Sequence, residues 1–364
     1  MRYTVILPEG GRGFSLEGAR AIDTTIAGHH MVRNAALDAN RLTIEEQVSS
    51  AGGTLAADEV RMARREAARL GAGALRLNAP ADTIRRWRFA GSPDRSALAP
   101  LEAAYAARIE QDPGAVDQIV NRARFRMDTY DFTGALADFD RALELERSAD
   151  LLVARSQAWA ELRNRARSRD DLAEAYDLDP DPWRALPLAD AMAETGDPDG
   201  AVDLLLQIDG DEELRQAVKN TLADAHALAG DVQGGLAYID EVLSTAPNDP
   251  QSLNSKCWFM GRYGLDLDDA LPICTRAVES ADAPAAALDS RALVLLRLGQ
   301  LDEALADAEA ALDLEPGLVP TELVRGLILR EMGNREAEAI IRGALARSPA
   351  ITPVYQRMGF DLGE

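Results

Sequence analysis

The sequence predicts a mainly α-helical solenoid of about seven helix hairpins, preceded by a small β-rich segment. Three observations predict it. A small residue recurs at a nearly constant interval along most of the chain. Hydrophobic residues make up 47% of the 364 residues but aromatic residues only 5%, which favours closely packed helices over a β-sandwich. The first fifty residues alternate apolar and polar side chains instead of following a helical period.

The stretch LRLGQLDEALADAEAALDLEP, residues 296–316, shows the repeating unit most clearly. Gly299 is expected to end a first helix, because a left-handed residue costs glycine least. Ala304 and Ala311 are small enough to let two helices touch, and Pro316 stops the second helix. Residues equivalent to Ala304 recur at spacings of 33, 33, 34, 35, 34 and 33. They are Ala135, Ser168, Ala201, Gly235, Ala270, Ala304 and Ala337.

On these residues the chain resembles tetratricopeptide (TPR) repeat proteins over residues 116–351, and the resemblance implies an α-solenoid that binds other proteins. The second unit departs from the pattern, since Arg163 stands where the helix-ending glycine belongs. The other segments are predicted as a small α+β segment (1–90), a linker with a capping helix (91–115) and a C-terminal capping tail (352–364). A solenoid needs caps because its end units otherwise expose an apolar face.

Within the front segment, five short strands are expected, together with a helix over 56–70 and a strand-like stretch over 73–80. The strands are RYTVIL, GFSLEG, AIDTTIAG, HMVRNAAL and RLTIEEQVSS. The glycine-rich PEGGRG, residues 8–13, lies between two of them. A phosphate-binding loop needs a helix after its glycines, and this one leads into alternating sequence. We therefore predict a hairpin turn here.

The front segment also resembles, over residues 1–77, the β segment that follows the catalytic core of bacterial transglutaminase-like proteins. The matching stretches are RYTVILPEGGRGFSLEG, IDTTIAG and LTIEEQVSSAGG. That family uses a Cys-His-Asp triad, and no residue here matches it, because both cysteines lie in the repeats. The resemblance implies a non-catalytic accessory region and, since such proteins are usually secreted, a periplasmic location. The chain itself shows neither a signal-peptide pattern nor a membrane-spanning run, so the cytoplasm is the other expectation.

Side chains that could carry catalysis are few, and we expect no enzyme activity, metal or cofactor. His29 and His30 are adjacent on a strand and point to opposite faces, and His226 stands alone. Cys257 and Cys274 lie on facing helices of the fifth unit. A disulfide is open to them in an oxidising compartment, but two buried thiols are favoured. The many carboxylates are assigned to exposed faces.

The net charge of −22 is unevenly distributed, because residues 1–90 carry 13 Arg against 10 Asp and Glu. The repeats therefore hold the whole acidic excess. A surface this acidic repels nucleic acid phosphates and anionic lipid. We expect a protein or peptide partner.

The TPR resemblance places one set of first-helix residues on the concave surface of the solenoid. These groove candidates are Arg124, Gln157, Asn220, Asn254, Trp258, Arg262, Arg297, Leu323 and Leu327. Asn220 and Asn254 could hydrogen-bond a peptide backbone, while Trp258 and the two leucines offer apolar contact; Trp258 fits packing between repeats equally well. Family members that clamp a C-terminal carboxylate use lysine here, and this chain has none at these positions. The predicted function is a non-catalytic scaffold, with an accessory region of a transglutaminase- or protease-like enzyme as the alternative.

Overall fold

The computed structural model describes residues 2–50, 52, 62–63, 66–67, 70, 74–80 and 85–363. The chain forms two compact units, Met1–Arg85 and Arg86–Glu364. Most of the helix predicted over 56–70 lies outside the described residues.

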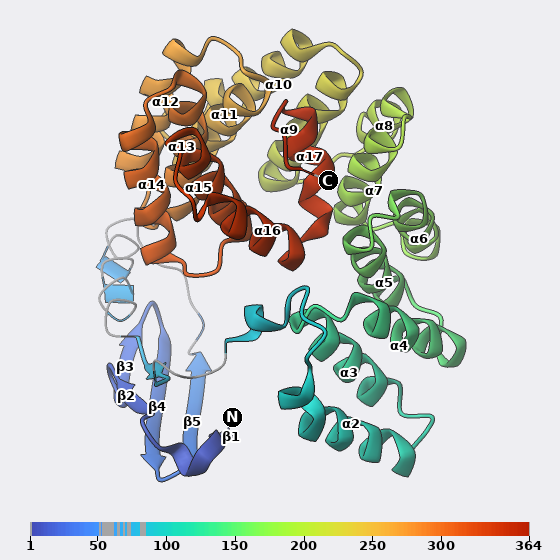
Figure 1. Cartoon of the computed structure of the whole chain (residues 1–364), viewed down its shortest axis with the longest axis vertical. Coiled ribbons are helices and arrows are strands. Elements are labelled where there is room, and N and C mark those ends of the chain that lie inside the picture. Colours follow the sequence, from blue (N-terminus) through green and yellow to red (C-terminus); the bar gives the residue numbers. More distant parts are fainter. Residues whose placement is uncertain are drawn as a thin grey trace. The chain divides into compact units, whose positions relative to one another are not determined.

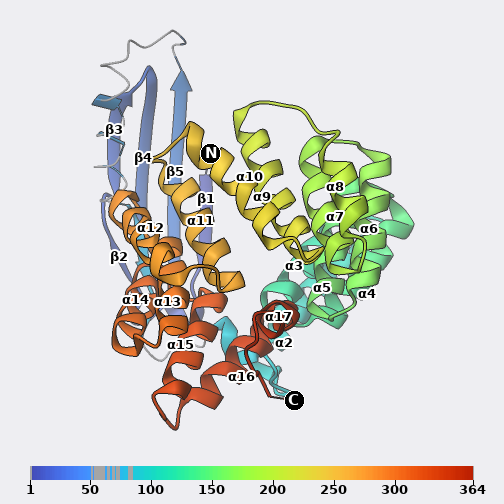
Figure 2. The ribbon, with the colours of Figure 1, turned by 90° about the horizontal axis from the view of Figure 1, so that it is seen from above.

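The first unit contains two small antiparallel sheets. Four strands form one sheet in the order β1-β5-β4-β3, which can be followed in Figure 2. The other sheet pairs β2 with β6. The strands are β1 (Arg2–Ile6), β2 (Ser15–Glu17), β3 (Ala21–Ile26), β4 (His29–Asp38), β5 (Arg41–Ser50) and β6 (Arg76–Asn78). All five predicted strands and the strand-like stretch near residue 77 are therefore present.

The glycine-rich stretch is a turn, as predicted, but the hairpin assigned to it was wrong. Residues Pro8–Gly11 form a 3₁₀ turn, after which β1 and β2 enter different sheets. The backbone N–H of Leu7 donates to the carbonyl of Asn40 at 2.7 Å, so β1 continues along β5 instead of pairing with β2. A Cβ on Gly11 would lie 2.2 Å from the carbonyl oxygen of Ala39. The glycines therefore allow the turn to pack against the β4–β5 connection, with no helix to receive a phosphate.

The second unit is a TPR-type α-solenoid in which seven helix hairpins follow one another (Figure 1). Helix α2 (Ala99–Gln111) precedes them, and η4 (Pro349–Ile351) and α17 (Thr352–Arg357) follow. The hairpins are α3 (Val116–Asp128) with α4 (Phe132–Leu145), α5 (Ala149–Glu161) with α6 (Arg165–Leu178), α7 (Pro182–Glu194) with α8 (Pro198–Leu205), α9 (Glu212–Leu228) with α10 (Val232–Thr245), α11 (Pro250–Tyr263) with α12 (Leu267–Ser280), α13 (Ala285–Leu298) with α14 (Leu301–Leu314), and α15 (Val319–Glu331) with α16 (Ala337–Arg347).

The recurring small residues lie where the two helices of each hairpin touch. Ala304 is fully buried, and a Cβ on Gly235 would lie 2.5 Å from the carbonyl oxygen of Ala223. Gly299 ends α13 with a φ of 74°, as the sequence predicts. Arg163 adopts the same left-handed conformation with a φ of 59°, so the second hairpin keeps its turn without a glycine. Packing between the helices outweighs the local backbone cost.

A recurring buried ion pair joins the two helices of three hairpins, and sequence reasoning missed it. Arginines 122, 155 and 291 each grip an aspartate 16 residues later through two hydrogen bonds. The aspartates are only 3%, 5% and 8% exposed, so assigning the carboxylates to exposed faces was wrong for them. They are Asp138, Asp171 and Asp307. An aspartate can stay buried because the guanidinium supplies both charge and donors.

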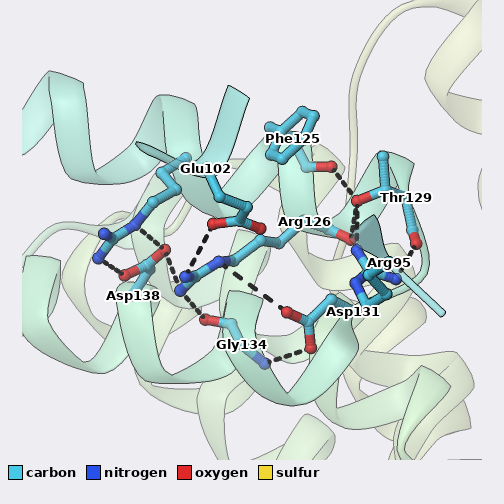
Figure 3. A network of polar contacts seen from close by, with 9 residues as sticks. Arg95, Glu102, Phe125, Arg126, Thr129, Asp131, Gly134 and Asp138 are labelled. Carbon is cyan, nitrogen blue, oxygen red and sulfur yellow. Dashed lines mark hydrogen bonds and ion pairs between the residues drawn. The ribbon is translucent and has the colours of Figure 1, made fainter. Parts of the chain in front are cut away.

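In the first hairpin this pair extends into a network that reaches the preceding helix (Figure 3). Arg126 donates to Asp138 at 2.9 Å, to the carbonyl of Gly134 at 3.1 Å and to Glu102 of α2 at 3.1 Å. Asp131 caps α4 by accepting from the N–H of Gly134 at 3.0 Å. Helix α2 is thus fixed to the first repeat by charge as well as by apolar contact.

Cys257 and Cys274 form a disulfide between α11 and α12, with their Cα atoms 5.0 Å apart. The preference for two reduced thiols was therefore wrong, and the open alternative holds. Both residues are fully buried among the apolar side chains of the hairpin.

Candidate binding groove

The first helix of each hairpin contributes the same positions to the concave side of the solenoid. One row, spaced by one repeat, is Val153, Leu186, Asn220, Asn254, Asp289 and Leu323. The second row, four residues further on in each helix, is Gln157, Asp190, Asp224, Trp258, Leu293 and Leu327. Residues four apart share a helix face, so both rows point the same way.

A cavity of about 370 Å³ opens on this side and takes its walls from α5 to α11 and from α17. Three predicted groove residues or their row neighbours line it: Gln157, Asp224 and Arg262. Val153 and Leu228 add apolar wall, so the lining is mixed, as expected for a surface that receives a polypeptide.

Charged side chains on the cavity wall form two connected groups. Arg262 donates to Asp224 at 2.8 Å, and the hydroxyl of Tyr263 donates to the same carboxylate at 3.3 Å. Glu194 pairs with Arg165 at 3.3 Å and with Arg357 of the C-terminal segment at 2.8 Å. Every one of these ion pairs joins helices of different repeats, so the network fixes the curvature of the solenoid at this point.

Asp190 lies between these groups, on the exposed side of α7, where it faces the cavity. The surrounding protein and the charges of Asp224 and Glu194 raise the pKa of Asp190 to about 7, although Arg262 and Arg165 act against this. Burial also raises the pKa of Asp224, and Arg262 and Tyr263 oppose that shift. The floor of the cavity thus holds carboxylates that carry less than their full charge at neutral pH.

Three acceptor atoms in the first row have no hydrogen-bond partner in the part of the chain that the structure describes. They are the side-chain Oδ1 atoms of Asn220, Asn254 and Asp289, each shielded from solvent. Their spacings of 34 and 35 residues place them at the same position in three successive repeats. A buried polar atom without a partner costs about 1–3 kcal/mol, so these three positions favour a ligand that donates hydrogen bonds.

The remaining predicted residues have different surroundings. Arg124 is exposed on α3 and does not line the cavity. Trp258 packs partly buried against the hydrophobic cluster of the last repeats, which is the structural role left open for it. Leu323 and Leu327 are buried in that cluster, beneath the protein's own C-terminal segment. Arg297 donates to the carbonyl of Met358 at 2.7 Å. The groove that remains open is therefore formed by the second to fifth repeats.

Asp289 should make stability depend on pH. Burial raises its pKa to about 6, against a hydrogen bond from Thr321 that lowers it. An unfolded aspartate titrates near 4, so the folded chain holds this proton more tightly, and its stability falls as pH rises from about 4 to 6. We expect Asp289→Asn to remove a penalty of about 1–2 kcal/mol at pH 7, less than the full shift implies because solvent reaches part of the side chain.

The measurement is urea unfolding of the wild type and of Asp289→Asn at pH 4.5 and at pH 7.5. The advantage of the variant should grow with pH, whereas Asp282→Asn, at an exposed position, should track the wild type at both. An advantage equal at both pH values would mean that Asp289 ionises normally.

No protein-family model matches the sequence, and no curated protein matches it. Several solved structures are similar to the chain. Yeast Tom70 is 14% identical, with 84% of this chain and 75% of that chain covered and a TM-score of 0.49. A tetratricopeptide repeat protein from Parabacteroides merdae is 12% identical, covering 67% and 99%, with a TM-score of 0.44. YrrB, a TPR protein with an unusual peptide-binding site, is 16% identical, covering 60% and 95%, with a TM-score of 0.28.

The helix pairs observed in the second unit make this chain a TPR-type α-solenoid protein with a small antiparallel β unit at its N-terminal end. Among the described residues, no helix is long and apolar enough to cross a membrane, and no group of three metal-ligating side chains comes together.

Proposed function

We propose that this protein is a non-catalytic interaction scaffold whose concave groove, from α5 to α11, binds a segment of a partner protein. The unpaired acceptors of Asn220 and Asn254 carry this proposal. Backbone N–H groups of a polypeptide recur along its length and would supply the missing donors. The mixed cavity beside them offers room for the partner's side chains.

The acidic surface supports a polypeptide partner over a nucleic acid. The net charge is −22 and belongs to the repeat region, so phosphates would be repelled from the solenoid. The alternative of an accessory region for a transglutaminase- or protease-like enzyme rests on the resemblance of residues 1–77 alone, and no comparison supports it.

The test selects peptides from a random phage-displayed library with the full-length chain and measures their affinities. We expect Asn220→Ala with Asn254→Ala to weaken the selected peptides about 10- to 30-fold, since two hydrogen bonds of about 1 kcal/mol each are lost. Gln251→Ala, an exposed amide on the same helix α11, is the matched control and should change affinity less than twofold.

Circular dichroism must first show that both variants keep their helices. Peptides that bind the double variant as tightly as the wild type would place the interaction outside the concave groove. A library that yields no binder to the wild type or to the control would argue against a peptide-binding scaffold.

A further inference from the structure

The C-terminal segment of this protein lies in the concave side of its own solenoid. Helix α17 packs beside α7 as well as against the last hairpins (Figure 1). Tyr355, only 2% exposed, and Met358 and Leu362 belong to the same hydrophobic cluster as the groove candidates Leu323 and Leu327. A segment predicted as an end cap therefore covers inner-surface positions of the sixth and seventh repeats.

Polar contacts of this segment reach repeats far away in the sequence. Glu161 of α5 accepts from the hydroxyl of Ser348 at 3.0 Å and from the N–H of Ala350 at 3.1 Å. Arg165 donates to the carbonyl of Ala350 at 2.8 Å, and Arg357 pairs with Glu194 at 2.8 Å. The segment thus spans the concave side from the second and third repeats to the last.

The position of α17 divides the groove. A second cavity, of about 310 Å³, lies beside the first, and both are lined by Leu228, Arg262 and Val354. Val354 belongs to α17, and Arg357 and Met358 of the segment complete the wall of the second cavity. Removal of α17 would therefore join the two cavities into one continuous groove.

The fit of the segment in its seat is incomplete. The hydroxyl of Tyr355, Oδ1 of Asp289, Oδ1 of Asn254 and Nε of Arg297 are all shielded from solvent and unpaired among the described residues. The charge of Asp289 acts on the Tyr355 hydroxyl without a hydrogen bond between them. Each such group costs about 1–3 kcal/mol, which offsets part of the apolar burial of Tyr355 and its neighbours. The segment is held, but more weakly than its buried area alone would give.

We propose that residues 348–362 are an internal ligand of the groove, which leaves its seat so that a partner segment of similar chemistry can bind. That partner would carry a short amphipathic helix with an aromatic anchor in the place of Tyr355. It would end in free carbonyls, because Arg297 and Arg330 donate to the carbonyls of Met358 and Asp361 at 2.7 and 2.6 Å. The segment follows the last hairpin, so it can detach without breaking any hairpin. This inference rests on the proposed function in placing the partner on the concave side.

The test uses the full-length chain and a fluorescent synthetic peptide of residues 348–362, with binding followed by anisotropy. Substitution of Tyr355→Ala with Arg357→Gln should loosen the protein's own segment, so the peptide should bind this variant at least tenfold more tightly than the wild type. Arg357→Gln alone removes only the pair with Glu194 and provides a milder variant if the double one folds poorly. Arg342→Gln, an exposed arginine on α16, should leave peptide affinity at the wild-type value.

Hydrogen exchange of the wild type supplies a second readout. Amides of residues 352–362 should exchange at least 100-fold faster than those of α15, because the segment opens on its own. Exchange at the rate of α15, or no gain in peptide binding by either folded variant, would overturn the proposal and leave the segment a permanent cap. Neither measurement uses a library peptide, so the proposed function can fail while this inference survives, and the reverse.

Discussion

Replacing Arg291 by methionine should destabilise the sixth repeat by about 3–5 kcal/mol, because it leaves the carboxylate of Asp307 buried and unpaired. Arg291 donates to the two oxygens of Asp307 at 2.6 and 2.7 Å, and Asp307 is 8% exposed. No second arginine or lysine ion pair is recorded for Asp307 among the described residues. By contrast, Asp138 is bound by both Arg122 and Arg126, so loss of Arg122 alone should cost less.

Equilibrium unfolding in guanidinium chloride measures the effect, together with hydrogen exchange of α13 and α14, since a repeat array need not unfold in one step. The double variant Arg291→Met with Asp307→Leu should recover most of the loss, because no charge then remains buried. Arg342→Met, on the exposed side of α16, controls for the loss of an arginine. A cost below about 1 kcal/mol for Arg291→Met would show that water reaches Asp307 and that the pair resembles a surface ion pair.

The second large effect concerns the disulfide. Joining residues separated by 17 positions restricts the unfolded chain and should contribute about 3 kcal/mol. We therefore expect Cys257→Ala with Cys274→Ala to lower the free energy of unfolding by about that amount, relative to the oxidised wild type. Alanine adds no buried hydroxyl, which makes it the cleaner replacement at two fully buried positions.

Unfolding of the wild type with and without reductant gives the same comparison without substitution. Thiol titration of the denatured, unreduced chain should find no free thiol among the two cysteines. Two reactive thiols in protein prepared under oxidising conditions would contradict the disulfide and restore the interpretation based on the sequence.

The sequence by itself determined the repeat and the order of the elements. Small residues near every 34th position predict hairpins because only they let two helices approach, and the structure buries Ala304 and leaves no room for a side chain at Gly235. The strands of the first unit were likewise readable from alternation, since side chains in a strand point to opposite faces in turn. The recurring arginine and aspartate 16 residues apart were also present in the sequence. They were missed because ion-pairing across a hairpin leaves no local pattern.

Only the tertiary structure decided which strands pair, whether the two cysteines join, and what occupies the groove. The hairpin assigned to residues 8–13 was wrong because β1 finds its partner in β5, more than thirty residues further on. The groove positions Leu323 and Leu327 followed from the repeat period, but their burial depends on Tyr355 and Met358, which lie outside any repeat. A period records how each unit packs on its neighbours. It carries no information about a segment that crosses the concave side from the seventh repeat to the second, because that contact depends on the curvature summed over all the repeats between them.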